Sequence, residues 1–189
     1  MSPISLKPSM SILSNIINRH SVAVAVAVSL GSNLPYLNRS PREIVFAAME
    51  SLRGICIKSQ ASSLYLSEPI GCAPCTGDFI NAAMVLHLTS KVSACEFLAV
   101  LQGIEADYGR QRGADQNQAR TLDIDIISYG SQKVESTGLI LPHPRAAQRR
   151  FVLMPLAEIH PEMVFPGQSA NIAQLLAALP RIDSVRLLI

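Results

Sequence analysis

"VAVAVAVSL", residues 22–30, is the stretch that decides the fold. It is a nearly continuous run of small apolar residues, which is typical of a strand that has neighbours on both sides in a sheet. The run ends at Gly31-Ser32-Asn33, a turn signal. We therefore expect a central strand here, with the remaining elements arranged around it.

Helix and strand patterns alternate along the next hundred residues. A helix begins at Ser40-Pro41 and ends at Gly54, and a second amphipathic helix spans 93–109 and ends at Gly109. Further strand patterns cover 55–66, 79–90 and 120–130. The order strand, helix, strand, strand, helix, strand predicts an α+β fold: a ferredoxin-like βαββαβ sandwich with an antiparallel sheet and both helices on one face.

The C-terminal part adds smaller elements to this sandwich. We expect a turn at 130–138, helices around 151–159 and 171–179, and a final strand at 184–189. The chain shows no internal repeat and no interdomain linker. Its 189 residues fit one domain, which we place at 22–189 behind a flexible N-terminal extension, 1–21.

Composition excludes several classes of protein. Apolar residues make up 49% and charged residues 16%, which argues against disorder, and no apolar run reaches the ~18 residues of a membrane span. The net charge of +2 is too small for a general nucleic-acid binder. The acid-poor start of the chain fits a tail or an organellar transit peptide, and we favour the tail. We expect a cytoplasmic monomer that acts on small molecules, with no membrane or nucleic-acid partner.

The four cysteines do not indicate a metal or redox site. One C-x-x-C, Cys72 to Cys75, stands in a Pro- and Gly-rich loop without the second ligand pair that zinc requires. Reduced, unpaired thiols in the cytosol are the better interpretation.

Residues 120–130, RTLDIDIISYG, carry two aspartates one residue apart. Because side chains alternate along a strand, Asp123 and Asp125 point to one face and Ile124 to the other. The two carboxylates repel each other, and a divalent cation such as Mg²⁺ would remove the conflict. The alternative is an edge strand whose aspartates form an ion pair with Arg120 and face water; the strand alone leaves both interpretations open.

Arginines gather near this strand. Planar guanidinium groups suit phosphate oxygens, so arginines beside a magnesium site indicate a nucleotide triphosphate. No G-x-x-x-x-G-K-[ST] motif is present, so side chains and metal, rather than a P-loop, would hold the phosphates. The arginines within residues 110–150 are Arg110, Arg112, Arg120, Arg145, Arg149 and Arg150.

Seven segments in one order resemble the 6-hydroxymethyl-7,8-dihydropterin pyrophosphokinases, which transfer pyrophosphate from ATP to a pterin alcohol in folate biosynthesis and release AMP. The pairing of R-T-L-D-x-D-I with L-P-H-P-R is the most specific. The segments are VSLGSNL (28–34), SEPIG (67–71), DFINAAM (78–84), IEADYGRQR (104–112), RTLDIDIISYG (120–130), LPHPR (141–145) and RRFVLMPLAEI (149–159).

The resemblance implies roles for individual residues. Two Mg²⁺ ions would bind Asp123 and Asp125, and Arg110 and Arg120 would be the catalytic clamps on the phosphates. Further ATP contacts would come from Glu105, Arg112 and His143. Pterin contacts would come from Ile70, Phe79, Asn81, Arg149 and Phe151.

Two loops depart from the family pattern. The segment CAPCTGDF (72–79) lacks a Gln- and Pro-containing run, and Gln118-Ala119 stands where Gly-Pro is usual. Losing a proline gives the backbone more freedom, so we expect looser loop closure and slower turnover.

Two rival functions share the predicted fold. Nucleotidyl cyclases and polymerase palm domains also place paired aspartates on ferredoxin-like strands, but they release pyrophosphate rather than AMP. An RNA-binding module would need aromatic side chains on its central strands, and residues 22–30 offer none.

Overall fold

Strand β1 (Ala23–Ser32) lies inside a six-stranded antiparallel sheet, as its apolar run predicts. The computed structural model describes residues 23–69, 77–110, 119–180 and 185–188. Strands β5 (Asp123–Tyr129) and β4 (Phe79–Thr89) flank β1 on its two sides. The other side of β4 pairs with β2 (Lys58–Ala61) and β3 (Tyr65–Ser67), and β8 (Val185–Leu187) forms the far edge beside β3. The ferredoxin-like order is therefore confirmed, with β5 at one edge.

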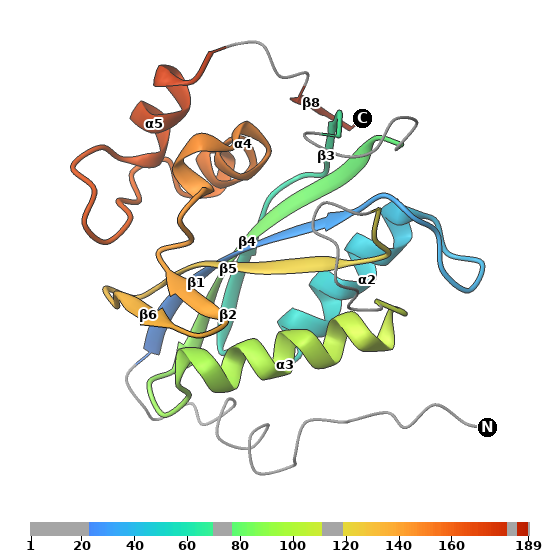
Figure 1. Ribbon diagram of the computed structural model, residues 1–189, viewed down its shortest axis with the longest axis horizontal. Helices are drawn as coiled ribbons and strands as arrows, with labels where there is room; N and C mark the ends of the chain where they lie inside the picture. The colour runs from blue at the N-terminus through green and yellow to red at the C-terminus, as the bar shows by residue number, and fades with distance from the viewer. Residues whose placement is uncertain (1–22, 70–76, 111–118, 181–184, 189) are drawn as a thin grey trace.

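Helices α2 (Pro41–Arg53) and α3 (Ala94–Asp107) both pack on one face of this sheet (Figure 1). Each begins with a capping box: Ser40 pairs with Glu43 in α2, and Ser93 with Glu96 in α3. These reciprocal bonds satisfy N–H groups that have no partner within the helix. Gly109, at φ +77°, follows the end of α3.

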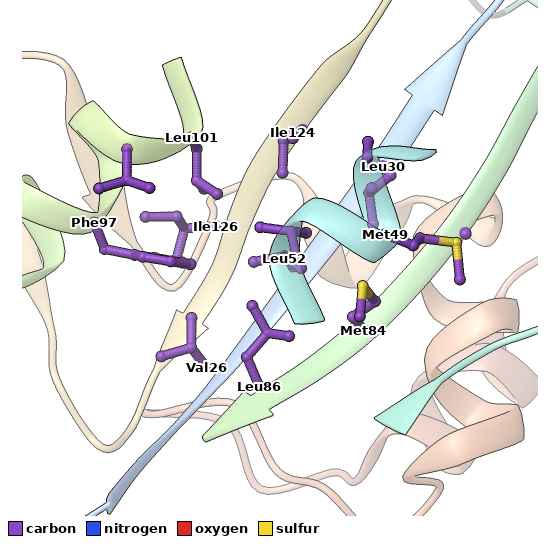
Figure 2. Close-up of a cluster of buried hydrophobic side chains, with 14 of the residues drawn as sticks. Val26, Leu30, Met49, Leu52, Met84, Leu86, Phe97, Leu101, Ile124 and Ile126 are labelled. Atoms are coloured by element: carbon purple, nitrogen blue, oxygen red, sulfur yellow. The ribbon is translucent and has the colours of Figure 1, made fainter. Parts of the chain in front are cut away.

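Two hydrophobic cores lie on opposite faces of the sheet. The larger core, between the sheet and α2 and α3, holds long and branched side chains (Figure 2): Val26, Leu30, Met49, Leu52, Met84, Leu86, Phe97, Leu101, Ile124 and Ile126. The second core packs small sheet residues, Ala27 and Ala83 among them, against α4 (Arg150–Ile159) and α5 (Ile172–Ala178). The C-terminal additions thus cover the face that the βαββαβ unit leaves open.

Two predicted elements differ from the structure. The strand expected at 55–66 is broken into β2 and β3, because Ser62 leaves the strand and its Oγ accepts a hydrogen bond from the N–H of Ala83, 2.9 Å away. The turn expected at 130–138 is part of a hairpin, β6 (Val134–Ser136) and β7 (Leu139–Leu141). A short 3-10 helix, η1 (Ala146–Gln148), precedes α4. Within the described ranges, no helix is both long and apolar enough to cross a bilayer.

Candidate active site

The two aspartates of β5 point to the α4 side of the sheet. Ile124 and Ile126 belong to the α2/α3 core, whereas Ile127, two residues beyond Asp125, packs with α4. The predicted common face of Asp123 and Asp125 is therefore confirmed.

Strand register aligns three residues of neighbouring strands, β5, β1 and β4, across the candidate site. Gly31 of β1 pairs with Asp123 on one side and with Asn81 of β4 on the other. We call Asp123, Gly31 and Asn81 the polar row. Neighbouring strands lie about 4.8 Å apart, so the backbones of Asp123 and Asn81 are separated by roughly 10 Å. The glycine between them has no side chain to fill that space.

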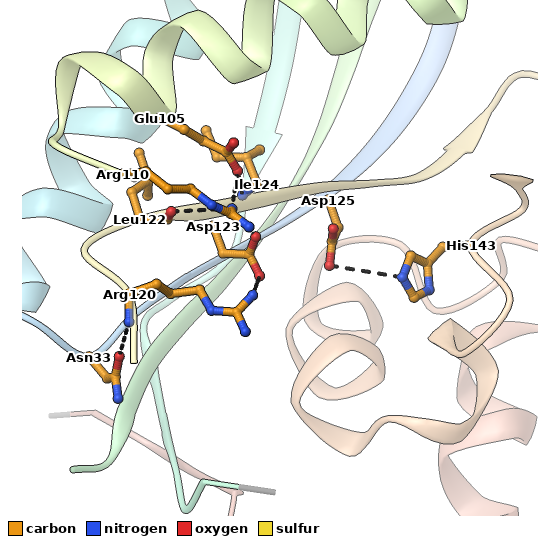
Figure 3. Close-up of polar contacts among 9 residues, drawn as sticks. All are labelled: Asn33, Glu105, Arg110, Arg120, Leu122, Asp123, Ile124, Asp125 and His143. Atoms are coloured by element: carbon orange, nitrogen blue, oxygen red, sulfur yellow. Dashed lines mark hydrogen bonds and ion pairs between the residues drawn. The ribbon is translucent and has the colours of Figure 1, made fainter. Parts of the chain in front are cut away.

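Asp123 is the meeting point of the two predicted catalytic arginines (Figure 3). Its Oδ1 accepts a hydrogen bond from Nη1 of Arg110, and its Oδ2 accepts one from Nη1 of Arg120 at 2.5 Å. Between 20% and 24% of each of these three side chains is exposed. The polar row thus ends in two guanidinium groups that converge on one carboxylate.

The Glu105 side chain is buried, whereas a residue that contacts ATP directly would be accessible to the nucleotide. Only 3% of its side chain is exposed, and its Oε1 accepts hydrogen bonds from the backbone N–H of Ile124, at 2.8 Å, and from Nη1 of Arg110. Its carboxylate therefore anchors Arg110 and β5 from beneath. We assign it a role through Arg110 rather than on the nucleotide.

Asp125 on β5 and His143, in the segment between β7 and η1, face each other (Figure 3). His143 Nε2 lies 3.9 Å from Asp125 Oδ2, and its Nδ1 accepts a hydrogen bond from the backbone N–H of Arg145. That bond leaves the proton of the neutral ring on Nε2. Burial, followed by the charges of Arg149 and Arg145, lowers the pKa of His143 to about 4, so the ring is a neutral donor at pH 7.

The pKa of Asp125 is raised to about 6, first by desolvation and next by the negative charge of Asp123. The charge of Arg149 acts in the opposite direction. About 40% of the Asp125 side chain is exposed, although protein surrounds the carboxylate on most sides. Ionising Asp125 beside the Asp123 carboxylate therefore costs free energy, and a bound cation would offset that cost.

Arg149 and Phe151 form one unit at the start of α4. The Arg149 guanidinium carbon lies 5.4 Å from the centre of the Phe151 ring, a cation–π distance. Burial lowers the pKa of Arg149, and Asp125 and Asp123 act against that change, which places this cation near both aspartates. Arg149 therefore lies between the Phe151 ring and the charges of the two aspartates.

Two further predicted pterin residues, Phe79 and Asn81, lie on β4. The amide of Asn81 donates to Ser67 Oγ at 2.9 Å and to the carbonyl of Phe79 at 3.2 Å. A Cβ added to Gly31 would lie 3.4 Å from Asn81 Oδ1 and 3.9 Å from the Phe79 ring. The space above Gly31 is therefore bordered by Asn81 Oδ1, a hydrogen-bond acceptor, and by the edge of the Phe79 ring.

Asn33 is a site residue that the sequence analysis did not single out. Its Oδ1 accepts from the backbone N–H of Arg120 at 2.8 Å, its own N–H donates to the Arg120 carbonyl, and its Nδ2 donates to the carbonyl of Gly77 at 3.3 Å. It therefore joins the end of β1 to the arginine segment and to the approach to β4. The G-S-N that follows the first strand is the only signal of this role in the sequence.

Some predictions fall outside the site or outside the described chain. Arg112 and Ile70 lie outside the described residues, as do the thiols of the C-x-x-C segment. Arg150, one of the arginines near the aspartate strand in sequence, donates instead to the carbonyls of Leu179 and Pro180 at 2.8 and 3.1 Å, because α5 ends beside the first turn of α4. It is a structural residue.

The edge-strand alternative for the aspartates describes part of the geometry. β5 is an edge strand, and Asp123 does pair with Arg120. The carboxylates do not simply face water, however, because both lie on the side that α4 covers. The ion pairs of Arg110 and Arg120 with Asp123 are thus compatible with an anion-binding site: the carboxylate balances the two guanidinium charges while no anionic ligand is bound.

The donor set fits Mg²⁺. In the part of the chain that the structure describes, no three His, Cys, Asp or Glu side chains form a preassembled metal cage. Mg²⁺ needs none, since it keeps several waters and usually takes one or two carboxylates together with substrate phosphates. Asp123 and Asp125, on one face with a raised pKa at the second, are the carboxylates that could hold such an ion.

Comparisons with known proteins agree with this arrangement. Residues 27–161 match the family model for 7,8-dihydro-6-hydroxymethylpterin-pyrophosphokinase (HPPK). The chain is 36% identical over 157 residues to the 2-amino-4-hydroxy-6-hydroxymethyldihydropteridine pyrophosphokinase of Synechocystis sp., covering 83% of this chain and 75% of the relative. The enzyme of that name from Pseudomonas aeruginosa is also 36% identical over 157 residues, covering 82% and 91%.

A solved structure shows the same fold. A Plasmodium falciparum HPPK-DHPS variant, crystallised with pterin and p-hydroxybenzoate, superposes with a TM-score of 0.63 at 14% identity, covering 87% of this chain. This chain spans 45% of that longer protein. Sequence and fold together lead to one conclusion: the chain belongs to the 7,8-dihydro-6-hydroxymethylpterin-pyrophosphokinase family.

Proposed function

We propose that the chain transfers pyrophosphate from ATP to the hydroxymethyl group of 6-hydroxymethyl-7,8-dihydropterin, releasing AMP, as a step of folate biosynthesis. The polar row is the observation that carries the proposal. It sets the backbone of Asp123, whose carboxylate binds two arginines, roughly 10 Å from the backbone of Asn81, with Gly31 between them. The ring of Phe79 and the amide oxygen of Asn81 border Gly31. A triphosphate at one end and a flat heterocycle at the other would meet over that glycine.

The triphosphate end is formed by Arg110, Arg120, Asp123 and Asp125. Each guanidinium offers five N–H donors in a planar fork, so both can bind phosphate oxygens at the place where they now converge. Two Mg²⁺ ions bound at the aspartates would neutralise the triphosphate and align it for in-line displacement. His143, neutral at pH 7, adds an N–H donor beside Asp125.

The pterin end is formed by residues of β4 and α4. Asn81 presents Oδ1 over Gly31, because its amide hydrogens are bound to Ser67 and to the carbonyl of Phe79. Acceptors at this position suit the amino and ring N–H groups of a pterin edge. The rings of Phe79 and Phe151 would stack on the heterocycle, and Arg149, held over Phe151, would bring a positive charge toward the transferring group. Ile70 and Arg112 are proposed contacts from their sequence positions alone.

The remaining expectations belong to this proposal. Residues 22–189 would be one catalytic domain, which the single sheet joining β1 to β8 supports. We further propose that the enzyme is a monomer and works in the cytoplasm. Size-exclusion chromatography with light scattering tests the first of these two, and imaging of a tagged protein in its own cells tests the second.

A direct assay tests the activity. The purified protein is incubated with ATP, Mg²⁺ and 6-hydroxymethyl-7,8-dihydropterin, and the adenine nucleotides are separated. AMP should form only when both the pterin and the metal are present. AMP-free reactions of a folded, ATP-binding protein would refute the proposal, and cyclic nucleotide with free pyrophosphate would identify the cyclase chemistry instead.

A further inference from the structure

A tyrosine ring lies directly on Gly109, the residue before Arg110. A Cβ built on Gly109 would stand 2.2 Å from Cε2 and 2.5 Å from Cδ2 and Cζ of Tyr36, distances that no real side chain reaches. Gly109 also has φ +77°, a backbone conformation that favours glycine. The ring and the glycine therefore fit each other closely, although 73 residues separate them in sequence.

Tyr36 is held in place by a tight and strained turn. Tyr36 and Arg39 exchange two backbone hydrogen bonds, of 3.0 and 2.9 Å, around Leu37 and Asn38. Both central residues have positive φ, +45° and +61°, which costs roughly 1 kcal/mol or more for a residue with a side chain. Leu37 is 76% exposed, so its own packing does not offset this cost. Such strain persists where the contacts of the flanking residues determine the conformation.

The flanking residues make those contacts on the end of α3. Tyr36 covers Gly109, and the guanidinium carbon of Arg39 lies 6.0 Å from the centre of the Tyr108 ring. At this point the helix ends: the N–H of Gly109 donates to Ala106 and the N–H of Arg110 to the carbonyl of Glu105. The turn at 36–39 therefore contacts the chain at Tyr108 and Gly109, directly before Arg110, whose side chain binds Asp123.

The same loop also fixes the second arginine. Asn33, three residues before Tyr36, binds the backbone of Arg120 through its side chain and its own N–H. One short segment, 33–39, thus contacts the backbone at or beside both guanidinium groups that converge on Asp123.

We propose that Tyr36 is a positioning residue for the transfer reaction, acting through Gly109 on the orientation of Arg110. The inference rests on the proposed function for its kinetic consequence, but not for its structural one. Losing the ring would leave Gly109 free to change conformation and would let the Arg110 guanidinium move away from Asp123. Misplacement of a transition-state contact by about 1 Å costs up to ~10²-fold in rate.

Tyr36→Ala is the test, and Tyr36→Phe is its matched control because all three close contacts are made by ring carbons. We expect kcat to fall about 10- to 100-fold in Tyr36→Ala, with the KM for the pterin nearly unchanged and kcat restored in Tyr36→Phe. The structural readout is the heteronuclear NOE of the Arg110 Nε–Hε pair, assigned by its loss in Arg110→Lys. It should drop in Tyr36→Ala and remain at the wild-type value in Tyr36→Phe, whether or not substrates are present.

The outcomes separate the inference from the proposed function. An inactive wild type would refute the function, while the NOE comparison would still decide the role of Tyr36. A wild-type kcat in Tyr36→Ala, or an unchanged Arg110 NOE, would overturn the inference. If Tyr36→Ala does not fold, Tyr36→Leu, which keeps apolar volume without a flat ring, replaces it under the same criteria.

Discussion

The two faces of the central sheet differ most clearly along β1, where alternate residues of one strand serve opposite faces. Val26, Val28 and Leu30 enter the core beneath α2 and α3. Ala27 packs toward α4, and Gly31 lies between Asp123 and Asn81 on that same side. The large side chains on one face fill the main core, whereas on the other face Ala27 packs under α4 and only Gly31, further along the strand, leaves room for a ligand. The strand's period of two therefore separates stability from activity.

Asp125→Ala gives the largest expected effect on the α4 face. Without this carboxylate the proposed second magnesium position would be lost, and kcat should fall by about 10³ or more. Stability should not fall, because a destabilising anion has been removed. Steady-state kinetics with saturating Mg²⁺ and a melting curve provide the two measurements. Wild-type turnover in the variant would remove the metal assignment.

Arg120→Ala tests whether the converging arginines act in the transition state. We expect kcat to drop by about 10³, as for other phosphate-stabilising arginines. Arg53→Ala is the matched control, since Arg53 is exposed on α2 and its guanidinium pairs with its neighbour Glu50, away from the polar row. A change confined to KM would show that Arg120 only binds ATP.

Leu30→Ala should show the reverse pattern on the other face. Leu30 is 1% exposed in the α2/α3 core, and its truncation should lower the free energy of unfolding by about 3 kcal/mol. The KM for the pterin should stay within about twofold at temperatures where the variant is folded. Urea titration gives the first quantity and initial rates the second; a selective loss of pterin binding would contradict the separation of the two faces.

Gly31→Val sharpens the comparison by placing a core-type residue on the ligand face. Its Cβ would stand 3.4 Å from Asn81 Oδ1, and the two methyl groups would extend over the floor of the polar row. We expect the KM for the pterin to rise about tenfold, equivalent to ~1.4 kcal/mol. Gly31→Ala, whose Cβ makes ordinary contacts, should have a much smaller effect. Equal KM values in all three proteins would place the pterin elsewhere.

The smallest effect concerns pH and stability. Because the folded-state pKa of Asp125 is raised from 3.8 to about 6, its protonated form favours the folded protein, and that stabilisation is lost as the pH rises from about 4 through 6. Asp125→Asn does not titrate, so in EDTA it should melt about 2–4 °C above the wild type at pH 7 and close to it at pH 4. This corresponds to ~1 kcal/mol, reduced for partial exposure. A difference independent of pH would show that Asp125 is not the responsible group.

Local patterns predicted most of the fold, since each depends on near neighbours. The helix starts at Ser40 and Ser93 and the common face of Asp123 and Asp125 follow from local pattern alone. The break between β2 and β3 could not be predicted, because the side chain of Ser62 binds a strand that comes later in the chain. The resemblance assigned Arg110, Arg120 and Asp123 to one site, and the structure brings their side chains together. The resemblance did not reveal the burial of Glu105, the bridging role of Asn33 or the ring of Tyr36 on Gly109, which depend on contacts between distant segments.

The bond from Arg150 to the end of α5 has a consequence for protein engineering. The guanidinium of Arg150 binds the carbonyls of Leu179 and Pro180, one residue away from Phe151 and Arg149. A truncation before Leu179 would leave that cation without these acceptors at the start of α4. C-terminal tags and fused domains therefore belong after β8, so that both Pro180 and the edge strand remain in place.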